Sequence, residues 1–391
     1  MKITQLRTDL VRVPLTQPAR WSGGTRMAAP AVLLTLETDE GLTGYGEAVG
    51  PTLAPLQTVL EVEFKPLLIG ADPLRIEDHW QTLAKGGFYR GGPILSSALA
   101  GIDQALWDIA GKVRGAPVHE LLGGPVRERV RVYAWIGGDD PAEAGEQAAA
   151  QAEAGLTAVK LNATGRFGFC ETREEVARAV RRAEQVRAAL GDGRDLAIDF
   201  HGRVSPPMAK RLLAALEDVA PLFVEEPVVP ELGHALPALV AGTTIPIATG
   251  ERLYSRWDFR PVLEAGVAIV QPDLSHAGGI SEVRRIAAQA ETYGAALAPH
   301  CPLGPIALAA CVQVACATPN FLIQEQSLGI HYNVDNDVLD YLVDRSVFAF
   351  HDGTVARPTA PGLGVEVDEE KLQHYHEAYR RNGQFLPYRM T

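Results

Sequence analysis

Six acidic or histidine side chains recur at nearly even intervals in the second half of the chain. Each comes at the end of a short apolar run, and successive ones are 22 to 27 residues apart. They are Asp199, Glu225, Glu251, Asp273, His300 and Glu325. The first three, Asp199, Glu225 and Glu251, are expected to face one cavity. Their carboxylates would repel one another there unless a cation lay between them. Oxygen-only ligands favour a hard ion, so the pattern predicts a Mg²⁺ site.

An alternative to a metal site is that one or two of these three carboxylates form ordinary salt bridges at strand ends. The sequence offers three arginines close to them, namely Arg203, Arg252 and Arg256. The regular spacing of the acids favours the metal.

Two histidines accompany the carboxylates. LAIDFHGR, residues 196–203, is expected to be a strand whose last residues carry Asp199 and His201 on one face, because side chains of a strand alternate. His201 would then point at whatever the metal holds, although an Asp and a His that meet backbone donors at a strand end fit this segment equally well. Asp273 and His300 end consecutive runs, and a carboxylate beside an imidazole fixes its tautomer and raises its basicity. The pair is a candidate general base, whereas His300 alone would be interpreted as a buried structural histidine.

Eight apolar runs with strand-like composition carry these residues. They are VRVYAW (130–135), AVKLN (158–162), LAIDFH (196–201), LFVEEP (222–227), IPIATGE (245–251), IVQPDL (269–274), ALAPH (296–300) and FLIQEQ (321–326). Helical periodicity lies between them: in SPPMAKRLLAALEDV, Ser205 can cap a helix in which Met208 and Leu212 are four residues apart. Short buried strands that alternate with helices pair in parallel, and eight such units close a (β/α)₈ barrel. The carboxyl ends of its strands form one rim, where the spaced acids and histidines would meet.

The opening part of the chain has a different pattern. KITQLRTDLVRV alternates, AVLLTLETDEG is rich in strand-forming residues up to a glycine turn, and residues 94–109 place apolar side chains on one helix face. Residues 1–124 are therefore predicted to be an α+β unit, followed by the barrel over 125–328. Residues 329–391 contain no ninth barrel unit and are expected to return to the opening unit.

The composition is that of an ordinary globular protein, with 391 residues, 47% hydrophobic and 21% charged. A net charge of −12 argues against nucleic acid as a partner, and no apolar stretch reaches the length that spans a membrane. The four cysteines show no C-x-x-C spacing and the first residues lack the apolar run of a signal peptide. These features predict a cytoplasmic protein.

Several longer stretches give the chain a resemblance to the mandelate racemase branch of the enolase superfamily. They are FYRGGPILSSALAGIDQALWDIAGK, DFHGR, EEPV, GER, QPDLSHAGGI, APHCPLGPIALAAC and QEQSLGIHYN. The resemblance covers essentially the whole length, and it implies an α+β capping domain, built from the N-terminal region and the C-terminal tail, over a modified TIM barrel. It also implies one Mg²⁺ per subunit and a reaction that begins with removal of the proton next to a carboxylate; this superfamily pairs a Lys or His base with Mg²⁺.

One departure from that branch bears on the reaction. Racemases and cycloisomerases of the group carry K-x-K at the end of the second barrel strand, where this chain has Lys160, Leu161 and Asn162. An amide cannot abstract a proton, so a racemase or epimerase that needs a base on each face is disfavoured. The resemblance then implies an acid-sugar dehydratase, in which His300 takes the C2 proton, Mg²⁺ and a protonated Glu325 stabilise the enediolate, and His201 protonates the departing C3 hydroxyl. Glu325 could instead be bonded to its neighbouring glutamines, and a barrel without activity is the least favoured alternative, because none of the expected residues is missing.

Substrate recognition is the least defined part. The resemblance implies an aldonate substrate, with D-galactonate expected and gluconate as the alternative. Loops 18–27 and 46–51 are expected to hold its polyol tail, with Arg20 and Trp21 as candidate contacts unless they only line a solvated flap. Lys160 is expected to meet the substrate carboxylate or a metal ligand, unless it forms a structural ion pair, and Asn162 is a further candidate contact. Barrels of this family often form dimers or larger rings, so a homo-oligomer is expected.

Overall fold

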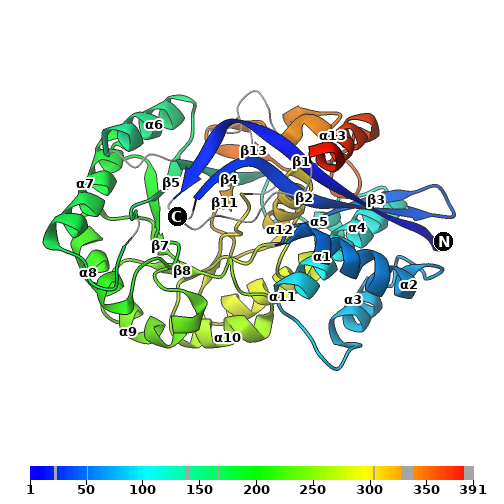
Figure 1. Cartoon of the computed structure of the whole chain (residues 1–391), viewed down its shortest axis with the longest axis horizontal. Helices are drawn as coiled ribbons and strands as arrows, with labels where there is room; N and C mark the ends of the chain where they lie inside the picture. The colour runs from blue at the N-terminus through cyan, green and yellow to red at the C-terminus, as the bar shows by residue number, and fades with distance from the viewer. Residues whose placement is uncertain are drawn as a thin grey trace.

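The computed structural model describes the chain except residues 22–23, 51, 137–140, 166, 303, 327–337 and 383–391. Within described elements, it does not define the side chains of 12–30, 338, 378–379 and 381–382. Two bodies of secondary structure are visible in Figure 1, a ring of alternating strands and helices and a sheet with its own helices at the N-terminal end.

The ring consists of eight parallel strands among the described residues. They are β4 (Arg129–Ile136), β5 (Ala158–Asn162), β6 (Asp195–Asp199), β7 (Phe223–Glu225), β8 (Ile247–Thr249), β9 (Ile269–Val270), β10 (Ala296–Leu297) and β11 (Gln324–Glu325). The helices outside them are α6 (Pro141–Glu153), α7 (Arg173–Leu190), α8 (Pro206–Leu216), α9 (Leu236–Val240), α10 (Arg256–Glu264), α11 (Gly279–Glu291) and α12 (Pro305–Ala317). The strand β4 exceeds its predicted run by one residue at each end and β5 matches its run, whereas β6 to β11 are shorter than predicted.

Backbone hydrogen bonds connect the last strands back to the first. Leu297 N–H donates to the carbonyl of Asn320, and Leu322 N–H donates to the carbonyl of Leu297, both at 2.8 Å. The same segment continues into β11, which pairs in parallel with β4. The path from β4 through β10 therefore returns to β4, as the fold predicted from the repeats requires.

Two apolar layers stabilise the ring. Small and aromatic side chains fill its interior, among them Ala197, Phe223 and Ala248. The outer faces of the strands pack against the helices, as when Leu196 and Ile198 meet Leu212 of α8 in one buried cluster. The interior is thus a packed core below a polar rim.

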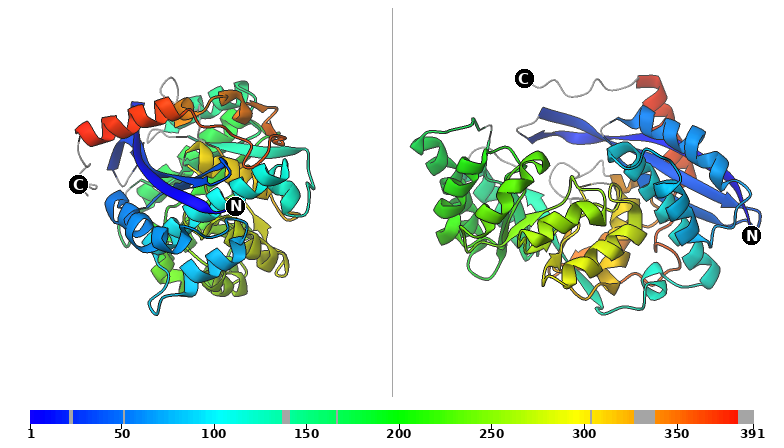
Figure 2. Two further views of the ribbon diagram at one scale, coloured as in Figure 1. Left: turned by 90° about the vertical axis from the view of Figure 1, so that its right-hand side faces the viewer. Right: turned by 90° about the horizontal axis from the view of Figure 1, so that it is seen from below.

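The N-terminal body is an antiparallel sheet of β1 (Ile3–Trp21), β2 (Gly24–Thr38) and β3 (Thr43–Ala48). Its helices are α1 (Leu53–Thr58), η1 (Val59–Phe64), α2 (Lys65–Leu68), α3 (Ile76–Lys85), α4 (Pro93–Arg114) and α5 (Val118–Leu121). The helix α4 begins with proline at its first position and ends at Gly115, whose left-handed backbone terminates it. The β1–β2 hairpin extends from this body toward the barrel (Figure 2).

The C-terminal segment contacts both bodies. Its elements are η5 (Val338–Tyr341), η6 (Arg345–Phe348), β12 (Phe350–His351), β13 (Thr354–Ala356) and α13 (Glu369–Asn382). The strand β13 pairs antiparallel with β4 of the barrel. Glu369 at the start of α13 receives hydrogen bonds from Arg7 Nη2 at 2.5 Å and Tyr45 Oη at 3.0 Å, which attach this helix to the N-terminal sheet.

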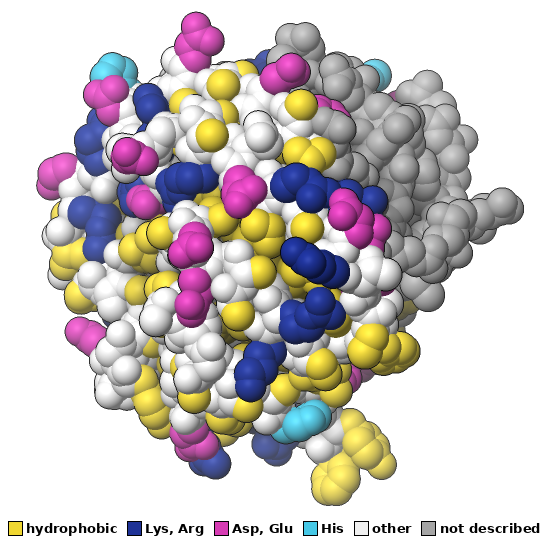
Figure 3. Space-filling model, turned by 90° about the vertical axis from the view of Figure 1, so that its left-hand side faces the viewer, with side chains coloured by type: hydrophobic (Ala, Val, Ile, Leu, Met, Phe, Trp, Pro, Cys, Tyr) yellow, Lys and Arg dark blue, Asp and Glu magenta, His cyan; other side chains and the backbone are white. Residues whose placement is uncertain are grey.

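The outer face over α7 and α8 carries charges of both signs. Acidic and basic side chains are interspersed on it (Figure 3), and Arg181 pairs with Glu174 at 2.7 Å. Within the described part of the chain, no helix combines the length and the apolar character needed to cross a bilayer.

The N-terminal sheet packs so closely on α4 that a glycine is required. A Cβ at Gly46 would lie 1.9 Å from the carbonyl oxygen of Gly101. We expect Gly46→Ala to lower the free energy of unfolding by about 2–4 kcal/mol, since a packed backbone contact cannot give way easily. Urea unfolding measures this. Gly193→Ala is the control, because a Cβ there meets nothing within 4 Å, and equal stability of the two variants would contradict the packing.

Candidate active site

Three carboxylates lie at the carboxyl ends of three neighbouring strands. Asp199 is the last residue of β6 and Glu225 the last of β7, and the two are partners in the parallel register. Glu251 follows the end of β8 by two residues. Asp199 and Glu225 are fully buried. The structure therefore brings together the three carboxylates predicted as metal ligands.

His201 meets Asp199 through a turn. The strand ends at Asp199, and His201 has a φ of 50°, in the left-handed region. Its backbone N–H donates to Asp199 Oδ1 at 2.6 Å, and its ring Nε2 lies 2.7 Å from Asp199 Oδ2, although not in hydrogen-bonding alignment. The prediction that strand alternation puts them on one face is wrong, because the strand stops before His201. Burial would raise the pKa of Asp199, but His201 lowers it overall.

Glu225 lies against a buried lysine. Lys160 Nζ donates to both Glu225 oxygens at 2.8 and 3.0 Å, and it also lies 3.1 Å from Glu325 Oε1. Gln271 Nε2 donates to Glu225 Oε2 at 2.8 Å. Burial raises the pKa of Glu225 to about 8 despite Lys160, with Asp199 and Glu325 adding to the increase.

Lys160 is only 2% exposed and lies between Glu225 and Glu325, below the rim. Of the two contacts predicted for Lys160, this is the one with a predicted metal ligand, Glu225; its contact with substrate stays a prediction. Glu325 accepts from Cys301 N–H at 3.0 Å through its other oxygen, so both of its oxygens face donors. That arrangement suits an ionised carboxylate and differs from the protonated donor that the resemblance implies.

His300 lies between two acids. Its Nδ1 is 2.7 Å from Asp273 Oδ2, and its Nε2 is 3.0 Å from Glu251 Oε2. Burial would lower the pKa of His300, but Glu251 and Asp273 raise it well above the usual value. Burial would likewise raise the pKa of Glu251, yet His300 and His201 lower it overall. Because Nδ1 is bonded to Asp273, Nε2 is the ring nitrogen that faces Glu251.

The three arginines considered as alternative salt-bridge partners of the carboxylates have their described contacts mainly elsewhere. Arg252 Nε approaches Glu251 only to 3.9 Å, Arg256 pairs with Glu282 at 2.9 Å, and Arg203 donates to the carbonyl of Thr164. The basic side chains that lie closest to the three carboxylates are instead Lys160, His201 and His300.

The donor set fits a hard cation. Three carboxylates at the ends of adjacent strands offer only oxygen ligands. Asp199 and Glu251 both raise the pKa of Glu225, as expected of negative charges close together. Asp199 Oδ2 is buried without a hydrogen bond. Among the described residues, no three acidic, histidine or cysteine side chains are already arranged to hold a metal ion. A cation here would replace histidine contacts to Asp199 and Glu251.

The residues predicted to contact substrate differ in where the structure places them. Asn162 Oδ1 accepts from Trp135 Nε1 at 3.2 Å at the end of β5. The side chains of Arg20 and Trp21 lie outside the described residues. Glu47, predicted to lie in the loop 46–51, lies on β3 instead, and it is buried and accepts hydrogen bonds from the amides of Gly304 and Ala307.

Sequence reasoning missed a second buried ion pair at the rim. Glu226 accepts from Arg252 Nε at 2.8 Å and from the Gly250 amide at 3.2 Å, which joins the loops after β7 and β8. The available signal was position, since Glu226 and Arg252 each directly follow a predicted ligand.

Comparison with known proteins agrees with this architecture. Residues 3–123 match the mandelate racemase / muconate lactonizing enzyme N-terminal domain, and residues 143–371 match the enolase C-terminal domain-like family. The chain is 50% identical to the D-galactonate dehydratase of Variovorax paradoxus over 375 residues, covering 96% of this chain and 94% of that protein. It is 51% identical to the D-galactonate dehydratase of Ralstonia nicotianae, covering 94% and 93% of the two.

Solved structures give the same result. An enolase from Agrobacterium radiobacter with bound Na and L-malate has a TM-score of 0.85 and 34% identity, covering 96% of this chain and 95% of that one. A mandelate racemase/muconate lactonizing enzyme from Sulfitobacter sp. has a TM-score of 0.86 and 33% identity, covering 100% and 99%. Both domains, the strand-end acids and the whole-length identity thus agree, and the chain belongs to the mandelate racemase / muconate lactonizing enzyme group of the enolase superfamily.

Proposed function

We propose that this protein is a Mg²⁺-dependent dehydratase that converts D-galactonate to 2-dehydro-3-deoxy-D-galactonate and water. The observation that carries the proposal is the single strong base: His300 is bonded to Asp273, while the position opposite in the family pattern is Asn162. The identity of about 50% to D-galactonate dehydratases over nearly the whole chain supports the substrate.

Asp199, Glu225 and Glu251 would hold the Mg²⁺. When bound, the ion supplies positive charge that neutralises the substrate carboxylate and makes the C2 proton more acidic. The same charge would compete with His201 and His300 for Asp199 and Glu251, which frees the two imidazoles. Lys160 would act as a fixed charge that holds Glu225 and Glu325 in place.

The two histidines perform the proton transfers. Asp273 holds the Nδ1 proton of His300, so that Nε2 is the nitrogen that removes the proton from C2 of the substrate. His201 is partly exposed at the rim and protonates the C3 hydroxyl as it leaves as water. The enol product then tautomerises to the 2-keto acid. Glu325 anchors the Cys301 amide next to His300, and its role as a donor to the oxyanion requires that it be protonated.

A racemase or epimerase is the second candidate, and Asn162 argues against it. Its amide oxygen already accepts from Trp135, and an amide cannot remove a proton from the other face of C2. Dehydration of another aldonate, such as D-gluconate, is the alternative within the same chemistry.

The substrate proposal is tested by a parallel assay of hexonates and pentonates with Mg²⁺. We expect D-galactonate to have a kcat/KM at least about tenfold above that of D-gluconate, or roughly 1.4 kcal/mol in transition-state binding. Mass spectrometry follows loss of water from each acid. If another aldonate is preferred by the same factor, D-galactonate is not the substrate; inversion at C2 without water loss would instead indicate an epimerase.

We also propose a cytoplasmic homo-oligomer. The four cysteines are all free, as suits a reducing compartment. Oligomerisation is proposed on the family resemblance, and light scattering of the purified protein tests it.

A further inference from the structure

The interface between the N-terminal domain and the barrel contains three buried polar side chains. They are Glu47 on β3 and Asp103 and Gln104 on α4, and each is at most 1% exposed. We call them the clamp residues. All three bond to the loops that follow β9 and β10 or to the helices that begin there, and these loops carry Asp273 and His300.

Gln104 holds the backbone next to Asp273. Its Nε2 donates to the carbonyl of Leu274 at 3.0 Å and to Ser275 Oγ at 3.2 Å. Ser275 N–H in turn donates to Asp273 Oδ1 at 2.7 Å, which leaves Oδ2 to face His300. Gln104 Oε1 accepts from Glu47 N–H at 2.9 Å, so the same side chain is attached to β3.

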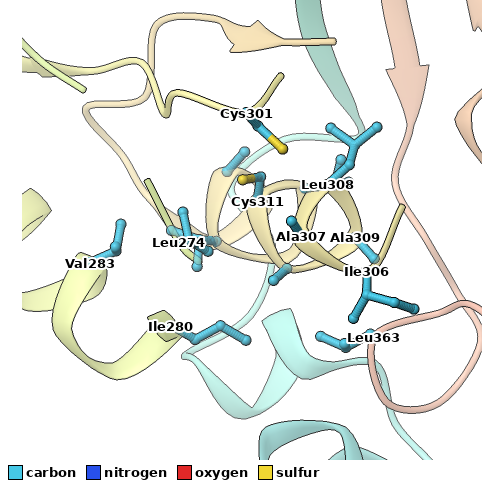
Figure 4. Close-up of a cluster of buried hydrophobic side chains, with 14 of the residues drawn as sticks. Leu274, Ile280, Val283, Cys301, Ile306, Ala307, Leu308, Ala309, Cys311 and Leu363 are labelled. Carbon is cyan, nitrogen blue, oxygen red and sulfur yellow. The ribbon is translucent and has the colours of Figure 1, made fainter. Parts of the chain in front are cut away.

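Glu47 holds the loop after His300. Its two oxygens accept from Gly304 N–H at 2.8 Å and Ala307 N–H at 3.1 Å, at the start of α12. A Cβ at Gly304 would lie 2.5 Å from Glu47 Oε1, so this approach requires glycine for space alone. Figure 4 shows Ile306 and Ala307 of α12 in the same buried cluster as Leu274 and Cys301. In the sequence, Leu274 directly follows Asp273 and Cys301 directly follows His300.

Asp103 holds the start of α11, which follows the Asp273 loop. It accepts from Ser281 N–H at 2.9 Å and from Ser281 Oγ at 2.5 Å. A Cβ at Gly279 would lie 2.5 Å from its Oδ2. Asp103 and Glu47 therefore cap two successive barrel helices from outside the barrel.

We propose that Glu47, Asp103 and Gln104 are positioning residues that set the alignment of the Asp273–His300 pair. The strands β9 and β10 have only two residues each, and beyond them the described β-pairing between the two loops is the isolated bridge between Asp273 and His300. The clamp residues supply bonds on both loops, and none of them bonds to Asp273 or His300 directly. A small displacement of a catalytic group can lower turnover about 100-fold, so loss of the clamp should act on kcat. The effect on kcat rests on the proposed function, whereas the effect on the loops does not.

The test compares Glu47→Gln and Gly304→Ala with Asp108→Asn. Asp108 is a matched control, because it is a buried carboxylate of α4 that instead accepts from Tyr45 N–H, Leu363 N–H and Lys112. We expect kcat to fall at least about tenfold in the two clamp variants with KM little changed, and Asp108→Asn to keep kcat despite lower stability. Gln104→Met provides a further clamp variant if Glu47→Gln does not fold.

A second readout does not depend on activity. Amide hydrogen exchange followed by mass spectrometry should show loss of protection in peptides spanning 271–278 and 298–304 in the clamp variants but not in Asp108→Asn. If the wild-type enzyme dehydrates no aldonate, the proposed function fails and this exchange alone decides the positioning role. Unchanged protection of these peptides, or a loss of kcat no greater than that of Asp108→Asn, would overturn the inference.

Discussion

His300→Asn is expected to lower the turnover of D-galactonate by at least about 10²–10⁴-fold, the typical contribution of a general base. The reason is that the ring bonded to Asp273 is the one strong base facing C2, and Asn162 offers no replacement. A coupled or mass-spectrometric assay of product formation measures the loss. Asp273→Asn should also reduce kcat, because the amide no longer fixes the Nδ1 proton.

His351→Asn is the matched control for His300→Asn. His351 is exposed and pairs only with neighbouring Asp352 among the described contacts of its ring, so its loss should leave turnover unchanged. Near-normal activity in His300→Asn, with the fold intact by circular dichroism, would show that another group removes the proton.

Glu225→Gln is expected to weaken Mg²⁺ binding at least about tenfold and to abolish turnover. Replacing even an outer partner of a metal ligand costs about 10–100-fold in affinity, and here a charged ligand becomes a neutral amide. The fold should survive, because Gln keeps the volume of Glu225 and Lys160 remains paired with Glu325. Calorimetric titration of the metal-free protein with Mg²⁺ measures the affinity.

Glu217→Gln is the control, because Glu217 is an exposed carboxylate directly after α8 that accepts hydrogen bonds from Thr243 and Thr244. EDTA should inactivate the wild-type enzyme, and added Mg²⁺ should restore it. Full activity of Glu225→Gln after chelation would contradict the proposed metal site.

The barrel could be predicted from the sequence because its signal is periodic. Short apolar runs alternate with amphipathic helices, and acids at steps of 22 to 27 residues identify the rim to which each run leads. The strand ends are predicted less well, since the predicted runs at β9, β10 and β11 have five or six residues while each strand has two.

The site contacts could be predicted only in part. Spacing indicates which rim a residue reaches but not how deeply its side chain is buried, so it does not show that Lys160 lies buried against Glu225 and Glu325. His201 meets Asp199 through a left-handed turn that no alternation pattern encodes. The sequence pattern places Glu47 in a substrate loop. Its bonds to Gly304 and Ala307 join residues more than 250 positions apart, which a local pattern cannot indicate.

The division of labour between the two histidines is tested most directly by NMR of the C2 proton of D-galactonate in D₂O with Mg²⁺ and the His201→Asn variant. His201 acts only on the departing hydroxyl, so this variant should exchange the C2 proton for deuterium while forming almost no dehydrated product. The His300→Asn variant should do neither, because the first proton transfer is blocked. A 3-fluoro analogue, whose leaving group needs no proton, should still be eliminated by His201→Asn, and a fluoride electrode records it. Exchange at C2 by His300→Asn, or absence of exchange by His201→Asn, would contradict the assignment of His300 as the base.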